Sequence, residues 1–128
     1  MSILPHSASP VLQVSDLDKA FTFYTTVLGF TETFRYGTYG GVMSGKVSFH
    51  LCSYKDGPNV QPTGASSVYC FVESPAEVDA CYAQILANGG SVKVPPENQP
   101  YGMRDFCVRD PDGNILTFGA EVETAKAD

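Results

Sequence analysis

The apolar positions predict the same succession of elements twice along the chain. In the first half, residues 10–14 form a short apolar run typical of a strand, and a helical stripe follows at the spacing i, i+3, i+4, i+7 and i+11. The members of this stripe are Leu17, Ala20, Phe21, Tyr24 and Leu28. In the second half, residues 68–72 predict a strand, and the stripe consists of Val78, Cys81, Tyr82, Ile85 and Leu86. Each half therefore begins with a strand followed by a helix.

Residues that start and stop helices flank both stripes. Ser15 and Asp16 precede the first stripe, and Ser74 followed by Pro75 precedes the second. Such side-chain oxygens accept hydrogen bonds from the free amides of a first helical turn, where proline is also tolerated. Gly29 follows the first stripe and the Asn-Gly-Gly of residues 88–90 follows the second, which predicts the helix ends.

Three short strands are predicted after each helix. They cover residues 31–36, 41–44 and 47–53 in the first half, and residues 91–94, 105–108 and 115–119 in the second. The segment Asp110-Pro-Asp-Gly-Asn114 predicts a tight hairpin turn between the last two.

The two halves align when the chain is shifted by 58 positions, which places Val14 on Val72 and Tyr24 on Tyr82. We therefore predict one domain over residues 1–128, built from a module at 9–54 and a module at 66–121 that are joined by a linker at 55–65. The fold class is α+β: two βαβββ modules whose mostly antiparallel mixed sheets curve into a cup, with the helices outside. A cup of this kind is the expected ligand site.

Composition excludes several classes of partner. Eight Lys and Arg against fourteen Asp and Glu give a net charge of −6, which argues against nucleic acid or an anionic membrane surface as partner. The first residues lack the pattern of a secretory signal. The four cysteines stand singly in apolar runs, so we expect reduced thiols and a cytoplasmic protein.

Two groups of motifs resemble a known superfamily over about residues 9–121. The first consists of Val11 to Leu17, Phe23-Tyr24 and Leu28-Gly29-Phe30, and the second of Tyr101 to Phe106 and Arg109 to Asn114. Both resemble the glyoxalase, bleomycin-resistance and extradiol dioxygenase proteins, the vicinal oxygen chelate superfamily. The resemblance implies paired βαβββ modules and a homodimer, in which the N-terminal arm around residues 5–10 crosses to the partner subunit.

The resemblance also locates the positions where metal-dependent members hold their ion. Here these positions carry Ser9, His50, Ser67 and Thr117. Stable sites for a divalent transition metal need imidazole, thiolate or carboxylate ligands, and neutral hydroxyls bind such ions poorly. We therefore expect no bound metal or other cofactor and no catalytic residue, so the interpretation leans away from an enzyme.

His50 has three interpretations from sequence. It is a sheet-face histidine satisfied by a neighbouring hydroxyl or carbonyl, a hydrogen-bonding contact to a ligand in the cup, or a general base. The predicted ligand-binding residues combine the cup lining with two glycine-containing rims. They are His50, Ser67, Tyr69 and Thr117 in the cup, Tyr36 and Tyr39 on one rim, and Tyr101, Met103 and Arg104 on the other.

The leading hypothesis is a non-catalytic protein that binds and sequesters a drug or antibiotic, as the resemblance to bleomycin-resistance proteins implies. The ligand is expected to be aromatic and cationic, and the net charge of −6 agrees with a cation. The chain has no Trp, whereas close members often stack their ligand on one. The competing hypotheses are a glyoxalase-like lyase or isomerase, a dioxygenase-related metalloenzyme, and a protein-interaction module that uses the same cup.

Overall fold

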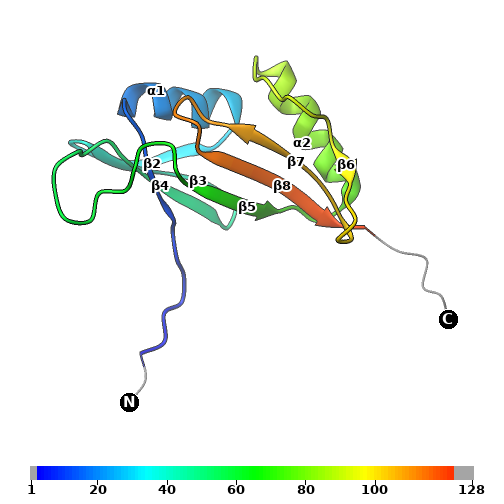
Figure 1. Cartoon of the computed structure of the whole chain (residues 1–128), viewed down its shortest axis with the longest axis horizontal. Helices are drawn as coiled ribbons and strands as arrows, with labels where there is room; N and C mark the ends of the chain where they lie inside the picture. The colour runs from blue at the N-terminus through cyan, green and yellow to red at the C-terminus, as the bar shows by residue number, and fades with distance from the viewer. Residues whose placement is uncertain (1–2, 123–128) are drawn as a thin grey trace.

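The computed structural model describes residues 3–122 and shows two βαβββ modules (Figure 1). The first module contains β1 (Val11–Gln13), α1 (Leu17–Thr22), a π-helical last turn η1 (Phe23–Val27), β2 (Thr31–Tyr36), β3 (Tyr39–Ser44) and β4 (Val47–Cys52). The second contains β5 (Ser67–Phe71), α2 (Pro75–Ala87), β6 (Glu97–Asn98), β7 (Met103–Arg109) and β8 (Ile115–Glu121). This arrangement confirms the predicted α+β class.

Each module builds one four-stranded mixed sheet. The strand orders are β1-β4-β3-β2 and β5-β8-β7-β6, so the two sheets repeat the same topology. In each sheet the first strand pairs in parallel with the last, and the remaining pairs are antiparallel. Both helices lie on the same side of the sheets, and the N-terminal segment leaves on the other side (Figure 1).

The helix boundaries follow the predicted caps. The Asp16 carboxylate accepts a hydrogen bond from the Lys19 amide at 3.0 Å, and the Ser74 hydroxyl accepts one from the Glu77 amide at 3.3 Å. Gly29 adopts a φ of 75° directly after the first helical segment. The local chemistry of the sequence therefore sets where both helices start and where the first one stops.

One predicted strand is wrong. Residues 91–94 are not in a strand, and the short strand β6 lies further along at Glu97–Asn98, where it pairs with Asp105 and Arg104. Pro95 and Pro96 follow the predicted segment directly. Because proline has no amide hydrogen to donate to a ladder, the hairpin can begin only after these two residues.

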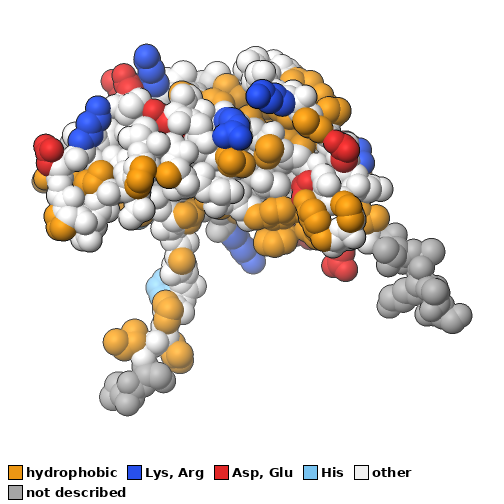
Figure 2. Space-filling view, viewed as in Figure 1, with side chains coloured by type: hydrophobic (Ala, Val, Ile, Leu, Met, Phe, Trp, Pro, Cys, Tyr) orange, Lys and Arg blue, Asp and Glu red, His pale blue; other side chains and the backbone are white. Residues whose placement is uncertain are grey.

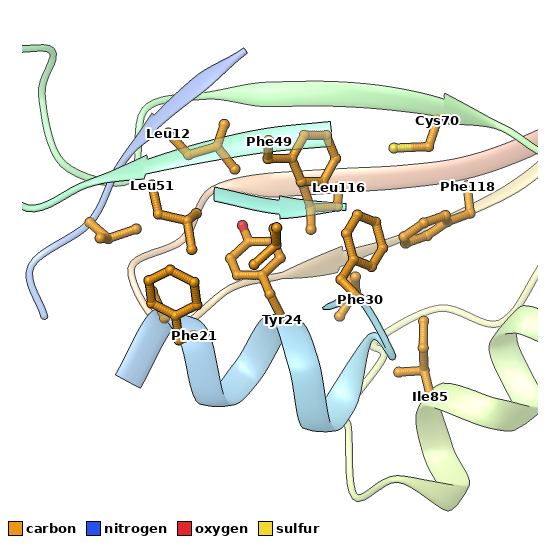
Figure 3. Close-up of a cluster of buried hydrophobic side chains, with 14 of the residues drawn as sticks. Leu12, Phe21, Tyr24, Phe30, Phe49, Leu51, Cys70, Ile85, Leu116 and Phe118 are labelled. Atoms are coloured by element: carbon orange, nitrogen blue, oxygen red, sulfur yellow. The ribbon is translucent and has the colours of Figure 1, made fainter. Parts of the chain in front are cut away.

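The two modules share one hydrophobic core between the helices and the sheets (Figure 3). Leu12, Tyr24, Phe49 and Leu51 of the first module belong to the same buried cluster as Leu116 of the second. His50 on β4 and Thr117 on β8 lie on the opposite faces of the sheets, away from this core, and both are half-buried.

Within residues 3–122, no helix is long and apolar enough to span a membrane.

Candidate functional site

A pocket of about 700 Å³ lies at one end of the first sheet. Its lining combines β1, the β2–β3 turn, the end of β4 and the loop that follows: Val11, Gln13, Tyr36, Gly37, Thr38, Tyr39, Cys52, Tyr54 and residues 57–61. The lining contains none of the charged residues Asp, Glu, Lys and Arg. The pocket thus suits an uncharged, largely apolar part of a ligand.

The loop after β4 forms one wall of this pocket. The Gln13 side-chain amide donates a hydrogen bond to the Tyr54 carbonyl oxygen at 2.7 Å, which ties the start of the loop to β1. Residues 57–61 were predicted as part of a linker, and their contribution to a pocket was missed. The signal that could have indicated a pocket wall was the presence of Tyr54 and Val60 in a stretch rich in proline and glycine.

An aromatic cluster of Phe34, Tyr39 and His50 lies beside the pocket. The rings of Phe34 and Tyr39 are stacked with centroids 6.1 Å apart, and Phe34 meets the His50 ring edge-on at 5.2 Å. The Tyr39 hydroxyl lies 2.8 Å from His50 Nδ1. Burial raises the pKa of Tyr39, so its hydroxyl keeps its proton at neutral pH.

Gly41 makes room for Phe34 in this cluster. It stands opposite Phe34 in the β2–β3 ladder, and a Cβ atom at position 41 would lie 2.4 Å from Phe34 Cε1. Sequence reasoning did not select Phe34 as a site residue. The signal available was a phenylalanine facing a glycine across a predicted hairpin, where an aromatic ring can cover the bare backbone.

A second pocket, of about 300 Å³, lies on the open face of the second sheet. Its lining consists of Tyr69, Val94, Pro95, Gln99, Tyr101, Asp105, Phe106, Cys107 and Thr117. The Asp105 side chain accepts hydrogen bonds from the hydroxyls of Tyr69 at 2.8 Å and Tyr101 at 2.6 Å. Tyr69 reaches across β8 over Gly119, where a Cβ atom would lie 2.0 Å from the Tyr69 hydroxyl oxygen.

The remaining predicted ligand residues are distributed around these pockets. Met103 lines a third hollow, of about 350 Å³, together with Phe71, and Ser67 is exposed. Arg104 donates to the Asp79 carboxylate of α2 at 2.8 Å and to the Asn98 side-chain oxygen, on the helix side of β7. Its charge is therefore directed away from the second pocket.

The four positions predicted from the resemblance as metal-ligand positions are divided between the two modules. The Ser9 hydroxyl is hydrogen-bonded to the Ser48 hydroxyl, next to His50 in the first sheet, whereas Thr117 lies on β8 of the second. Among residues 3–122, no three His, Cys, Asp or Glu side chains are grouped so that they could hold a metal ion. The donor set present here does not fit a catalytic metal centre.

Comparison with known proteins adds a family match. The model of the Glyoxalase/Bleomycin resistance protein/Dioxygenase superfamily matches residues 4–118. A bleomycin resistance protein of Geobacillus stearothermophilus is 30% identical over 128 aligned residues, covering 90% of this chain and 96% of that protein.

Two solved structures illustrate the range of proteins with this fold. A bleomycin-binding protein of Streptomyces verticillus, complexed with copper(II)-bleomycin, has a TM-score of 0.71 at 24% identity and covers 96% of this chain and 100% of that one. A lactoylglutathione lyase of Agrobacterium tumefaciens has a TM-score of 0.72 at 25% identity, covering 91% and 94%. The same architecture thus occurs in a binding protein and in an enzyme, and the residues of the site have to distinguish the two.

Proposed function

We propose that this chain, which belongs to the Glyoxalase/Bleomycin resistance protein/Dioxygenase superfamily, binds an aromatic small molecule and sequesters it without converting it. The observation that carries this proposal is the uncharged 700 Å³ pocket flanked by the Phe34, Tyr39 and His50 cluster. Aromatic walls with few directing polar groups are typical of binding sites for planar organic ligands.

The chemistry of His50 supports binding over catalysis. The Tyr39 hydroxyl occupies its Nδ1 atom, and no carboxylate is hydrogen-bonded to the ring among residues 3–122. A metal-ligating imidazole ordinarily donates its other ring N–H to a carboxylate, a backbone carbonyl or water. We assign His50 the role of a polar contact to the ligand at the edge of the aromatic cluster. Tyr36 and Tyr39 are the residues on which the ligand stacks in the adjoining pocket.

A thermal-shift series with bleomycin and with planar cationic antibiotics tests the proposal. A ligand present at about 100 times its dissociation constant is expected to stabilise the protein by roughly 2.7 kcal/mol. The variant Tyr39→Ala is expected to lose most of this shift. Tyr82→Ala, on α2 and absent from the lining of both pockets, serves as the control. Chromatography of the recovered compound should show it unchanged.

Two outcomes would contradict sequestration. One is the absence of any shift across the series, together with no gain of resistance in cells that express the chain. The other is turnover of a substrate by protein that carries one tightly held divalent ion per subunit by elemental analysis, with both lost in His50→Ala. The second outcome would favour a glyoxalase-like lyase or isomerase, or a dioxygenase-related metalloenzyme.

We further propose that two copies of the chain associate. Ile3 and Leu4 are 92% and 84% exposed, and hydrophobic side chains lie along the projecting N-terminal segment (Figure 2). Phe71 on the open face of the second sheet is 73% exposed. Burying such surfaces against a second copy is favourable. Light scattering of the purified chain is expected to give the mass of a dimer. A monomer mass for the Ile3→Ser/Leu4→Ser variant would assign the N-terminal segment to the interface between the two copies.

A further inference from the structure

The Asp105 carboxylate is held by neutral donors only. The residue is 6% exposed, and its side chain accepts hydrogen bonds from the Tyr69 hydroxyl at 2.8 Å, the Tyr101 hydroxyl at 2.6 Å and the Gln99 amide at 3.1 Å. Hydroxyl and amide groups of this kind fill acceptor positions of a carboxylate and bring no positive charge. The second pocket therefore contains a negative charge at its floor.

No protein cation neutralises this charge within the described part of the chain. The ion pairs there join Arg35 to Asp18 and Glu32, and Arg104 to Asp79, so none of them includes Asp105. A carboxylate offers about four acceptor positions, and the three neutral donors leave one of them free. A cation carrying an N–H group can fill that position.

The walls of the pocket also suit a cation. Tyr69 is half-buried and Tyr101 is exposed, and the aromatic rings of both line the pocket together with Asp105. Burial and the bond to Asp105 raise the pKa of Tyr69, and the bond to Asp105 raises that of Tyr101. Both hydroxyls therefore remain donors at neutral pH, and the rings keep the negative faces that attract cations.

We propose that this second pocket is a subsite for an N–H-bearing organic cation, an amidinium or primary ammonium group, on the ligand that the protein sequesters. This inference rests on the proposed binding function and divides the two pockets by chemistry. The lining of the first pocket has no charged residue, whereas the second pocket contains Asp105, so only the second offers a partner to a cation. Under the opposing interpretation, Asp105 only holds the two tyrosines in place and the pocket does not discriminate by charge.

The test compares benzamidinium with benzamide, two planar compounds of similar shape that differ in charge. Calorimetric titration of the wild-type chain is expected to show about tenfold tighter binding of benzamidinium. Asp105→Asn removes the charge with little change of shape and is expected to abolish this preference. Asp56→Asn makes the same change of net charge on an exposed loop residue and is expected to preserve the preference.

Equal affinities for the two compounds, or a preference that survives Asp105→Asn, would overturn the inference. If Asp105→Asn does not fold, NMR of the wild type with benzamidinium tests the subsite instead. We expect nuclear Overhauser effects between the benzamidinium ring protons and the ring protons of Tyr69 and Tyr101. Their absence overturns the subsite. The proposed function is judged separately, because uncharged aromatic compounds that stabilise the protein would support sequestration even if benzamidinium does not bind.

Discussion

The Tyr24 hydroxyl donates a hydrogen bond to Asp110 Oδ2 at 2.9 Å, in the interior where the two modules meet. Tyr24 is fully buried in the helix of the first module, and Asp110 begins the β7–β8 hairpin turn of the second. The same carboxylate accepts hydrogen bonds from the Asn114 side chain and from the amides of residues 112 and 114. A turn that the sequence marks by its proline and glycine therefore also joins the two halves.

Tyr24→Phe is expected to lower the free energy of unfolding by about 1–3 kcal/mol, because a buried carboxylate oxygen loses one of its donors. Urea denaturation monitored by circular dichroism measures this change. Tyr82→Phe is the matched control, since Tyr82 packs edge-on against Phe106 and is expected to change stability by less than about 0.5 kcal/mol. Equal stability of Tyr24→Phe and the wild type would show that this link does not stabilise the fold.

The same hydroxyl predicts a dependence of stability on alkaline pH. Burial and the Asp110 carboxylate raise the pKa of Tyr24 well above that of a free tyrosine, which is 10.0. A group whose pKa is higher in the folded state contributes its full stabilisation below about pH 10 and loses it as the pH rises further. Above that pH, the wild type should lose stability more steeply than Tyr24→Phe, by about 1.4 kcal/mol per pH unit. Parallel curves would contradict the assignment.

Gly119 is expected to resist substitution because Tyr69 lies across it. Its backbone is not in the left-handed region, so Gly119→Ala acts through the clash of the new methyl group with the Tyr69 hydroxyl. We expect a loss of about 1–3 kcal/mol from this crowding. A double-mutant cycle with Tyr69→Ala measures the coupling, and the loss should shrink once the ring is absent. An unchanged loss would mean that Tyr69 does not cause the constraint.

The cysteines are expected to react with a thiol reagent in the order of their exposure. Cys107 is exposed, whereas Cys70 is buried and burial raises the pKa of its thiol to about 11. Because the thiolate is the reactive form, Cys107 should react first with Ellman's reagent and Cys70 only when the protein unfolds. Cys107→Ser should remove the fastest phase. A fast phase that persists in this variant would place another reactive thiol at the surface.

Much of the local structure could be predicted from the sequence because it depends on short-range chemistry. Asp16 and Ser74 cap helices through hydrogen bonds to amides three residues away, and the apolar stripes select the helix faces that enter the core. Residues 91–94 were predicted as a strand because their composition allows one. The two prolines that follow have no amide hydrogen to donate, so these residues do not enter a strand ladder.

The site could be predicted only in part. Tyr36, Tyr39, Tyr69 and Tyr101 were selected from their positions near glycines or on a predicted strand face, and the structure places all four in pocket linings. Asp105 was not among the predicted ligand-binding residues, whereas Arg104 was, and the structure pairs Arg104 with Asp79. Which acid meets which base depends on strand twist and on the helix packed beneath, and the sequence pattern carries neither.

The sequence by itself determined the two βαβββ modules with their caps and turns, because these follow from periodicity and from residues close together in the chain. Its motifs also carried the resemblance to the family. The tertiary structure alone decided what surrounds each polar group. It placed Phe34 over Gly41, folded the loop of residues 57–61 into a pocket wall, and gave Asp105 three neutral donors and no cation among residues 3–122. These relationships join residues on different strands, and they arise only once the ladders have set the register.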